Sequence, residues 1–446
     1  MSTDASLPML TVRETAAVLT NVFAPNIAKG PIIRRPKVVA LSEKLRLDER
    51  AVATVKALSE KYPQSPVLLR LPLRRQAIVL EPRDVHRILA ESPDPFATDS
   101  SEKKAALAHF QPRNSLVSHG AERSVRRALQ DQVLDSASPV HHLAEPFLRV
   151  VAEEAEDLLA ASRATGVLAW DEFIRSWYRM VRRIVFGDAA ADDHELTDML
   201  QQLRADANWA FLKPRRRKLR AEFLAAVERR MQSAPPGSLA AVTAGANPPD
   251  DAAPREQIPQ WLFAFDPAGM ATFRSLAAIT AHPGVLSRVA EEVAEAHGQR
   301  SYLPWLRACV LESLRLWPTT PMVLRQTTAD VEWETGTIPA HCGVLIYAPF
   351  FHRDERTVPN PHAYTPERWL NDDDGDWALI PFSDGPAACP GRHLVLMLTS
   401  AFLSHLLGGS ALKLESPGRL KVGGRLPGTL DNYSLRFVVE ANAPQM

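Results

Sequence analysis

The chain has 446 residues, of which 46% are hydrophobic, and its 52 basic and 52 acidic residues give a formal net charge of zero. Such a balance provides neither a basic field that would recruit nucleic acid nor an acidic tail, so we expect no nucleic-acid partner. Three cysteines are too few for a disulfide framework. They fit a reducing compartment, where a thiol stays free to act as a ligand or nucleophile.

The amino-terminal segment has no basic region followed by an apolar run, and no stretch of the chain reaches about 18 uncharged apolar residues. We therefore expect a soluble, cytoplasmic protein with no transmembrane anchor. Residues 1–60 are predicted to form an irregular lead-in with one or two short helices.

The next segments predict a small β portion and a long loop. Apolar residues alternate or cluster in Val67–Arg70 and Gln76–Leu80, which predicts a short hairpin. Glu81–Ser92 is predicted to be a helix, and the polar residues 93–118 are predicted to be a long irregular loop. Long loops in compact proteins are often functional.

The rest of the chain is predominantly helical in its pattern. Apolar spacing of three and four residues predicts helix almost throughout His119–Arg230. Trp261–Ala281 is apolar on nearly every side, which is typical of a helix buried through the middle of a large domain. The other predicted elements are a loop over 233–259, helices up to Leu316, strands within Val331–Pro349, a helix over Arg392–Leu407 and a strand over Tyr433–Val439. The predicted fold class is mainly α with a small β region.

One cysteine lies in a loop suited to holding a thiolate. Phe382, Gly385, Cys389 and Gly391 stand just before the predicted carboxy-terminal helix. A glycine-rich loop that leads into a helix N-terminus supplies the N–H donors and the positive partial charge that keep a thiol deprotonated. The alternative is a buried structural cysteine, which is what we expect of Cys309 and Cys342.

The pattern Phe-x-x-Gly-x-x-x-Cys-x-Gly resembles the haem-binding signature of the cytochrome P450 superfamily, in which a cysteine thiolate holds the haem iron. The resemblance implies haem b as cofactor, Cys389 as the iron ligand, and Phe382, Gly385 and Gly391 as its haem-binding neighbours. It also implies one triangular domain over residues 1–446, with haem between the central helix and the Cys loop. Ala387 departs from the family, which has arginine or histidine there to contact a haem propionate.

Further motifs follow in the family order. Glu312 and Arg315 lie on one face of a predicted helix, and with Arg368 they match a buried structural charge network under the haem. Arg325 matches an arginine that reaches a propionate, and His119 and Arg123 resemble a propionate-binding pair of bacterial members. An arginine fork suits a carboxylate.

The central helix departs from the family pattern, in which an acid and a threonine relay protons to dioxygen. Two alignments with the family motif are possible. Matching the letters of the motif selects Ala268, Gly269 and Thr272, whereas counting back from the end of the helix places Asp266 at the acid position and Pro267 at the threonine position. We favour the second alignment because it supplies an acid. Peroxide-using members also have proline there, but they carry arginine where Asp266 stands.

By resemblance, the function is that of a bacterial-type monooxygenase that inserts one oxygen atom from O2 into a small, mostly apolar substrate, with a ferredoxin or flavodoxin as electron donor. The alternatives are a peroxide-driven enzyme, a haem-binding protein without turnover, and a helical protein without a cofactor. Substrate contacts are expected from residues 96–118, 205–225 and 319–324, the central helix and the turn near Thr429. A basic docking face is expected from Arg126, Arg127 and Arg392.

Overall fold

The computed structural model describes residues 7–370 and 378–440, and helices account for most of them. The α-helices are α1 (Val12–Val18), α2 (Ala24–Lys29), α3 (Pro36–Lys44), α4 (Leu47–Lys61), α5 (Pro82–Ala90), α6 (Ser101–Leu107), α7 (Gly120–Val133), α8 (Ala144–Thr165), α9 (Trp170–Phe186), α10 (His194–Ala207), α11 (Arg217–Gln232), α12 (Leu239–Gly245), α13 (Ile258–Ala281), α14 (Pro283–Glu295), α15 (Pro304–Leu316), α16 (Ala348–Phe351) and α17 (Arg392–Gly409). The strands are β1 (Val67–Leu68), β2 (Gln76–Ile78), β3 (Phe96–Ala97), β4 (Val167–Ala169), β5 (Met322–Thr327), β6 (Val331–Trp333), β7 (Gly336–Ile338), β8 (Gly343–Tyr347), β9 (Ala411–Leu414) and β10 (Arg436–Glu440).

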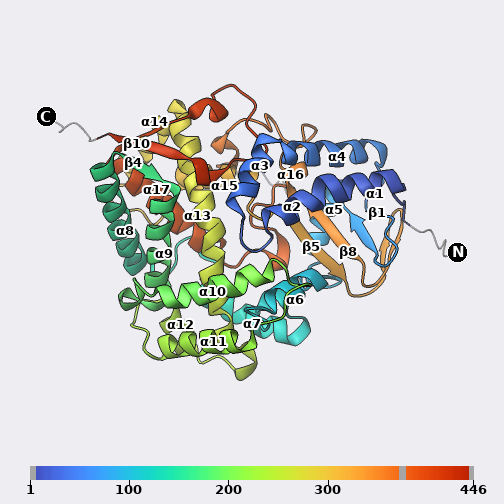
Figure 1. The fold of residues 1–446 in the computed structure, drawn as a ribbon, viewed down its shortest axis with the longest axis horizontal. Helices are drawn as coiled ribbons and strands as arrows, with labels where there is room; N and C mark the ends of the chain where they lie inside the picture. The colour runs from blue at the N-terminus through green and yellow to red at the C-terminus, as the bar shows by residue number, and fades with distance from the viewer. Residues whose placement is uncertain (1–6, 371–377, 441–446) are drawn as a thin grey trace.

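The helices and strands gather in different parts of the molecule (Figure 1). In the described residues the largest sheet has the order β1-β2-β8-β5-β3, with β2 and β8 parallel and the other pairs antiparallel. Helices α1, α4 and α5 accompany this sheet, while α8, α9, α13 and α17 form the helical part. Strands β4, β10 and β9 form a second antiparallel sheet beside those helices.

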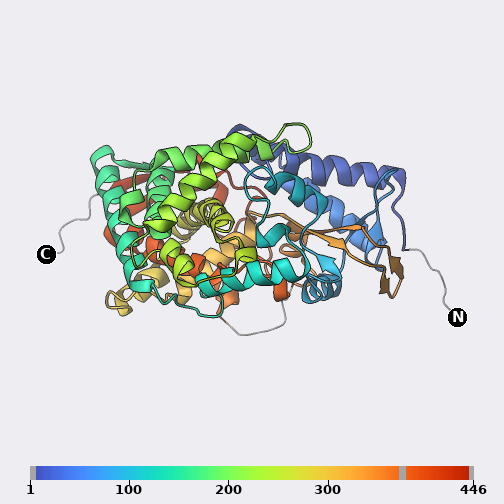
Figure 2. The same cartoon turned by 90° about the horizontal axis from the view of Figure 1, so that it is seen from below.

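Helix α13 is the axis of the helical part. Figure 2 looks nearly along it, with α10 and α11 crossing above. It begins with Pro259 in its first turn and ends before Pro283, positions at which proline is tolerated or stops a helix. From Ala268 to Ile279 every residue is buried, so the partly exposed residues of α13 lie in its first half and at its last two positions.

The prediction of an irregular lead-in over residues 1–60 was wrong, because α1 to α4 and a π-helical turn occupy most of it. A capping box formed by Thr11 and Glu14 starts α1. In α4, Ala51, Val55 and Leu58 recur at helical spacing and pack into the core of the β-rich part. That spacing was present in the sequence, but charged residues dilute it.

Other element predictions also needed correction. The loop predicted over 93–118 contains β3 and α6, and the loop over 233–259 contains α12 and the start of α13. Strands β5 and β9 were not predicted, and β10 begins at Arg436 because Asn432–Ser434 form a 3-10 turn. The buried face of β5 carries Arg325 and Thr327, so this segment lacks the alternation of apolar and polar residues that predicts a strand. The predicted hairpin, central helix, strands within 331–349 and carboxy-terminal helix are confirmed.

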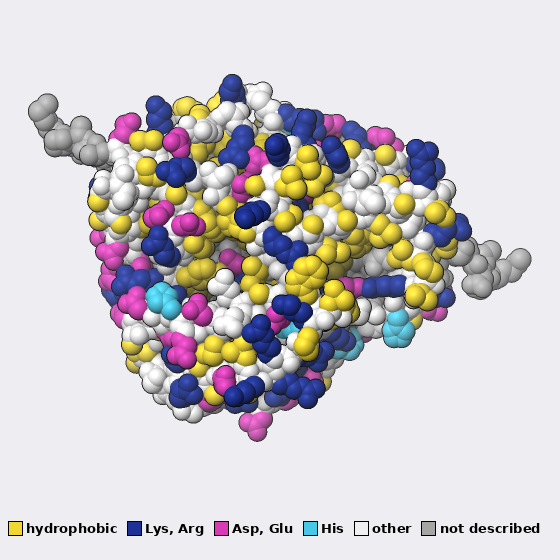
Figure 3. Space-filling view, viewed as in Figure 1, with side chains coloured by type: hydrophobic (Ala, Val, Ile, Leu, Met, Phe, Trp, Pro, Cys, Tyr) yellow, Lys and Arg dark blue, Asp and Glu magenta, His cyan; other side chains and the backbone are white. Residues whose placement is uncertain are grey.

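No helix within the described ranges is both long and apolar enough to cross a membrane. On the face shown in Figure 3, Lys and Arg side chains are interspersed with Asp and Glu, in keeping with the net charge of zero.

Candidate active site

The Cys389 loop is a tight turn that ends at the first residue of α17. Gly385 has a φ of 66°, and a Cβ there would lie 2.2 Å from the carbonyl oxygen of Leu89, so a side chain is excluded twice over. The N–H of Cys389 donates to the carbonyl of Phe382 at 2.9 Å. Gly391 is the N-cap of α17, and Phe382 is a partly buried ring that packs against the main core.

The thiol of Cys389 is half-buried and is neighboured by donors and cations. Burial raises the pKa of this thiol, whereas the backbone N–H of Gly391 and the charges of Arg127 and Arg392 act to lower it. In the metal-free protein the net shift is upward, so a bound cation is needed to hold the sulfur as a thiolate at neutral pH.

Three neighbouring elements fix the Cys loop in place. Arg127 of α7 donates to the carbonyl of Ala388 at 2.8 Å, and Ser136 donates to the carbonyl of Pro390 at 2.8 Å. Arg325 of β5 donates to the hydroxyl of Ser383 at 3.2 Å. The loop is therefore positioned by residues from α7, the α7–α8 connection and the largest sheet.

Beside this loop lies a cluster of three cations, defined here as the cation cluster: Lys103, Arg123 and Arg325. Burial lowers the pKa of all three, that of Lys103 to about 7 and that of Arg325 to about 10, and Arg123 and Arg325 each disfavour the charge of Lys103. No carboxylate within residues 7–370 and 378–440 forms an ion pair with any of them. The buried Nε of Arg123 has no hydrogen-bond partner.

An unpaired, buried positive cluster fits an anionic group, since buried charges otherwise require partners. The two propionates of haem b supply two carboxylates, and the cluster adjoins the loop that holds Cys389 through Arg325. The cation cluster therefore suits the propionates of haem, and the thiol of Cys389 suits its iron. Lys103, which the sequence did not single out, adds a third cation beside Arg325 and Arg123.

His119 is connected to the cation cluster through Asp99, whose charge acts on both Lys103 and Arg123. It is the exposed N-cap of α7, and its ring lies 3.8 Å from the carboxylate of Asp99, its ion-pair partner among the described residues. Arg126, expected on a docking face, is instead buried and donates to Ser118 at 2.6 Å. That expectation was wrong for Arg126, while Arg127 is half-buried and Arg392 is exposed.

In the middle of α13, Phe263, Ala264, Asp266 and Pro267 are partly exposed and share one helix face at spacings of three and four. Pro267 has no N–H, so the carbonyl of Phe263 loses its helical donor. Thr272 is fully buried, and its hydroxyl donates to the carbonyl of Ala268 at 2.8 Å. Asp266 and Pro267 thus share a face that Thr272 does not.

Asp266 has a specific partner in Arg204 of α10. Arg204 Nη2 lies 2.7 Å from Asp266 Oδ2, and its guanidinium stacks over the Phe263 ring at 4.5 Å. Tyr178 of α9 also bonds with Asp266, and burial raises the pKa of that phenol. The side chain of Trp177 donates to the carbonyl of Phe265 at 2.7 Å. Helices α9, α10 and α13 therefore meet at this carboxylate.

Glu312, Arg315 and Arg368 come together in the structure. Glu312 and Arg315 are completely buried and joined by two bonds of 2.8 and 2.7 Å, and Arg368 lies 3.2 Å from Glu312. Burial acts to raise the pKa of Glu312, but the charges of Arg315 and Arg368 outweigh it and the pKa is lowered. Glu312 also accepts from Thr365 N and Trp369 Nε1, at 2.9 Å each.

His352, which the sequence analysis missed, links this network to the Cys loop. Its Nδ1 bonds with the carbonyl of Arg315 at 3.0 Å, and its Nε2 accepts from the N–H of Ile380 at 3.0 Å. Burial lowers its pKa to about 3, so it is neutral. Ile380 lies two residues before Phe382, where the loop begins. His352 therefore connects α15 to the start of the loop through backbone atoms.

The other two cysteines are buried, and burial raises the pKa of both thiols, that of Cys342 to about 11. Cys309 hydrogen-bonds with Tyr364, and the thiol of Cys342 has the backbone N–H of Ala77 and the charges of Arg74 and Arg75 beside it. What distinguishes Cys389 is therefore its glycine-containing loop at the start of α17.

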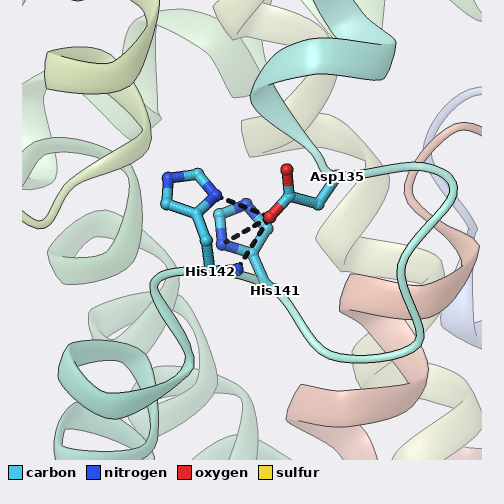
Figure 4. A group of neighbouring side chains, drawn as sticks. All are labelled: Asp135, His141 and His142. Carbon is cyan, nitrogen blue, oxygen red and sulfur yellow. Dashed lines mark hydrogen bonds and ion pairs between the residues drawn. The ribbon is translucent and has the colours of Figure 1, made fainter.

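Asp135, His141 and His142 form a separate group of possible metal ligands in the α7–α8 connection (Figure 4). His141 Nδ1 accepts from the N–H of Leu143 at 3.0 Å, and its Nε2 bonds with the carbonyl of Val133 at 3.0 Å. Asp135 accepts from both the N–H and Nδ1 of His142. Both ring nitrogens of His141 are thus engaged, and the group acts as a turn-capping network.

Comparisons with known proteins agree with this geometry. The family model for cytochrome P450 matches residues 262–417, which contain α13, the charge network and the Cys loop. A probable cytochrome P450 4d20 of Drosophila melanogaster is 30% identical over 174 residues, which cover 36% of this chain and 34% of that protein. Cyclooctat-9-en-7-ol 5-monooxygenase of Streptomyces melanosporofaciens is 35% identical over 134 residues, which cover 28% of this chain and 29% of that protein.

Each alignment thus spans about a third of the relative's length, whereas the fold matches nearly throughout. The solved structure of retinoic acid-bound cyanobacterial CYP120A1 superposes with a TM-score of 0.68 and 17% identity, over 86% of this chain and 93% of that one. The family model over residues 262–417, the fold and the ordered motifs thus all match those of the cytochrome P450 superfamily.

Proposed function

We propose that this protein is a haem-thiolate monooxygenase that inserts one oxygen atom from O2 into a small, mostly apolar organic substrate. The observation that carries the proposal is the pairing of the Cys389 loop with a buried cation cluster that has no carboxylate partner among the described residues. Bound haem b supplies a redox-active iron for the activation of dioxygen. We propose a ferredoxin or flavodoxin as electron donor and the cytoplasm as location.

On the sulfur side, the chain provides a ligand and its supports. Arg127 and Ser136 hold the carbonyls of Ala388 and Pro390, which keeps Cys389 at the start of α17. Arg325, Arg123 and Lys103 would bind the propionates, and Arg325 also bonds to Ser383 of the loop. The same arginine thereby ties the carboxylate site to the sulfur site.

On the opposite side, we assign the distal role to Asp266 and Pro267 rather than to Thr272. Thr272 is unsuited because its hydroxyl is fully buried and already donates within its own helix. Asp266 is partly exposed and carries a proton-accepting carboxylate. The freed carbonyl of Phe263 provides an acceptor for an ordered water beside it.

Asp266 must exchange partners to move a proton. Its Oδ2 accepts from Arg204, which holds the carboxylate turned toward α10. We propose that Asp266 releases its bond to Arg204, takes up a proton from solvent water on that side, and gives it to a water bonded to the Phe263 carbonyl, which releases a proton on the substrate side. Arg204 orients this carboxylate and is a positioning residue. General acid assistance of this kind contributes about 10²–10⁴-fold.

A peroxide-driven enzyme is the second candidate, and Pro267 is the observation that favours it. A proline at this place provides no hydroxyl to orient a proton, and Asp266 is tied to Arg204. Hydrogen peroxide is already reduced by two electrons and already carries protons, so an enzyme that uses it depends less on a proton relay.

The experiment is turnover of a compound panel by haem-loaded protein, either with ferredoxin, its reductase and NAD(P)H, or with hydrogen peroxide alone. Product, NAD(P)H consumed and peroxide released are measured for wild type, Asp266→Asn and the control Thr272→Val. We expect reductant-driven product formation that falls about 10²–10⁴-fold in Asp266→Asn and is unchanged in Thr272→Val. Product with peroxide alone would establish the second candidate, and no product with either oxidant would leave a haem-binding protein without turnover.

A further inference from the structure

A second positively charged site lies in a small cavity between the amino-terminal helices and α13. Its volume is about 40 Å³, room for about three water-sized groups, which is the size of a carboxylate. The polar and aromatic residues that line it come from α2, α4, α13 and three loops: Lys29, Arg34, Asp48, Arg274, Trp317, Thr319 and Thr429.

The charges that line this cavity do not cancel. Lys29 pairs with Asp48 at 2.6 Å, and Thr429 donates to the other oxygen of Asp48, so that carboxylate is fully occupied. Arg34 and Arg274 have no ion-pair partner in the part of the chain that the structure describes. The residues that line the cavity therefore carry more positive than negative charge, and the charges of Asp266 and Asp431 offset this excess only in part, without forming an ion pair with either arginine.

Backbone carbonyls hold both guanidiniums in place. Arg34 donates to the carbonyls of Gly30 at 2.8 Å and Thr319 at 2.7 Å. Arg274 donates through Nε to Leu430 at 3.0 Å and through Nη1 to Trp317 at 3.3 Å, while its Nη2 has no hydrogen bond in the described residues. Arg274 is 8% exposed and lines the cavity, so a buried cation with an unused donor forms part of the cavity wall.

Burial lowers the pKa of both groups, that of Arg274 to about 10, and Arg34 further disfavours the charge of Arg274. Arg34 is partly buried and Arg274 is buried, and two such adjacent cations without an ion-pair partner favour the binding of an anion. A carboxylate suits a guanidinium in both charge and fork geometry.

The position of the cavity connects it to the distal face of α13. Asp266, Met270 and Arg274 recur at a spacing of four, so they form one stripe along the helix. At a rise of about 1.5 Å per residue, Arg274 lies about 12 Å along the axis from Asp266. Met270 lies between them, lines the cavity and contacts the hydroxyl of Tyr433.

We propose that this cavity is a carboxylate-binding site that receives the acidic end of an elongated apolar substrate, with Arg34 and Arg274 as its ligands. That the apolar part of this substrate is oxidised rests on the proposed function. That the cavity binds a carboxylate does not. A free small carboxylate presents the same chemistry, so the test separates the two sources.

The experiment is isothermal titration of the haem-loaded protein with decanoate, decanol and acetate. We expect decanoate to bind at least about tenfold more tightly than decanol, the effect of one charge-assisted bond. Arg274→Gln and Arg34→Gln should each remove most of that preference without changing the affinity for decanol. Arg288→Gln, an exposed arginine on α14, is the matched control and should behave as wild type.

Acetate that binds as tightly as decanoate, with the same dependence on Arg274, would assign the site to a free carboxylate. An unchanged preference for decanoate over decanol in both variants would overturn the proposal. If Arg274→Gln fails to fold, Arg34→Gln and the charge-conserving Arg274→Lys, which should keep part of the preference, still decide it. Turnover is not needed, so failure of the oxygenase proposal would appear separately, as absent product beside intact Arg-dependent binding.

Discussion

Lys103 offers the sharpest test of how haem is held, because its assignment to a propionate rests on the fold alone and not on any sequence motif. Its ammonium donates to the carbonyl of Leu324 at 3.0 Å and is repelled by Arg325 and Arg123. If two propionates complete this cluster, Lys103→Met removes one charge-assisted bond to them. Such bonds contribute about 1.5–3 kcal/mol, so haem should dissociate about 10–150 times faster.

In the haem-free protein, where no propionate pairs with Lys103, the same substitution should stabilise the fold instead of weakening it. The pKa of Lys103 is lowered from 10.5 to about 7, so between these values the unfolded chain binds more protons than the folded one. Stability of the haem-free protein therefore rises with pH across that window, by at most about 5 kcal/mol and by less where water enters the cavity. Lys103→Met should abolish this rise and stabilise the haem-free protein at neutral pH.

The assay is transfer of haem to apomyoglobin at pH 6.5, followed by absorbance, together with denaturant unfolding of the haem-free protein at several pH values. Lys218→Met is the control, since Lys218 is a solvent-exposed lysine on α11 whose side chain is 93% exposed. Arg123→Ala and Arg325→Ala should also speed haem transfer. Transfer rates for Lys103→Met equal to those of the Lys218 variant would refute the assignment of Lys103 to a propionate.

Three further changes probe the frame around the site. Glu312→Gln leaves the buried Arg315 without a counter-charge, so we expect a loss of about 3–5 kcal/mol in unfolding free energy by denaturant titration; a loss below about 1 kcal/mol would contradict it. Gly385→Ala should lower both haem content and melting temperature, because its Cβ would meet the Leu89 carbonyl; normal haem content would show that the loop adapts. Pro267→Thr restores a donor to the Phe263 carbonyl and should raise the melting temperature without abolishing product formation; an unfolded variant would be inconsistent with this view of α13.

The sequence predicted those parts of the site that depend on local pattern. The Cys loop depends on glycines at fixed offsets from Cys389, and Gly385 shows why, since both its φ and its contact with Leu89 exclude a side chain. Glu312 and Arg315 are neighbours by helical spacing alone. Helix α13 was predictable because it is apolar on all sides.

Contacts between distant segments could not be predicted in this way. Lys103 and Arg325 are separated by more than 200 residues, and only the fold brings α6 beside β5. The same holds for Arg204, whose partner Asp266 lies on another helix, and for His352, which acts through backbone atoms on either side. The first helices were missed because their apolar faces are short and interrupted by charges.

The central claim is that Cys389 provides the thiolate ligand of haem iron, and the absorption spectrum of the reduced, CO-treated protein tests it most directly. The wild-type protein should give the red-shifted Soret band of a thiolate-ligated haem. Cys389→Ser should lose that band, while the controls Cys309→Ser and Cys342→Ser, at buried cysteines elsewhere in the fold, should keep it. A thiolate band that persists in Cys389→Ser, or that disappears in either control instead, would contradict the account.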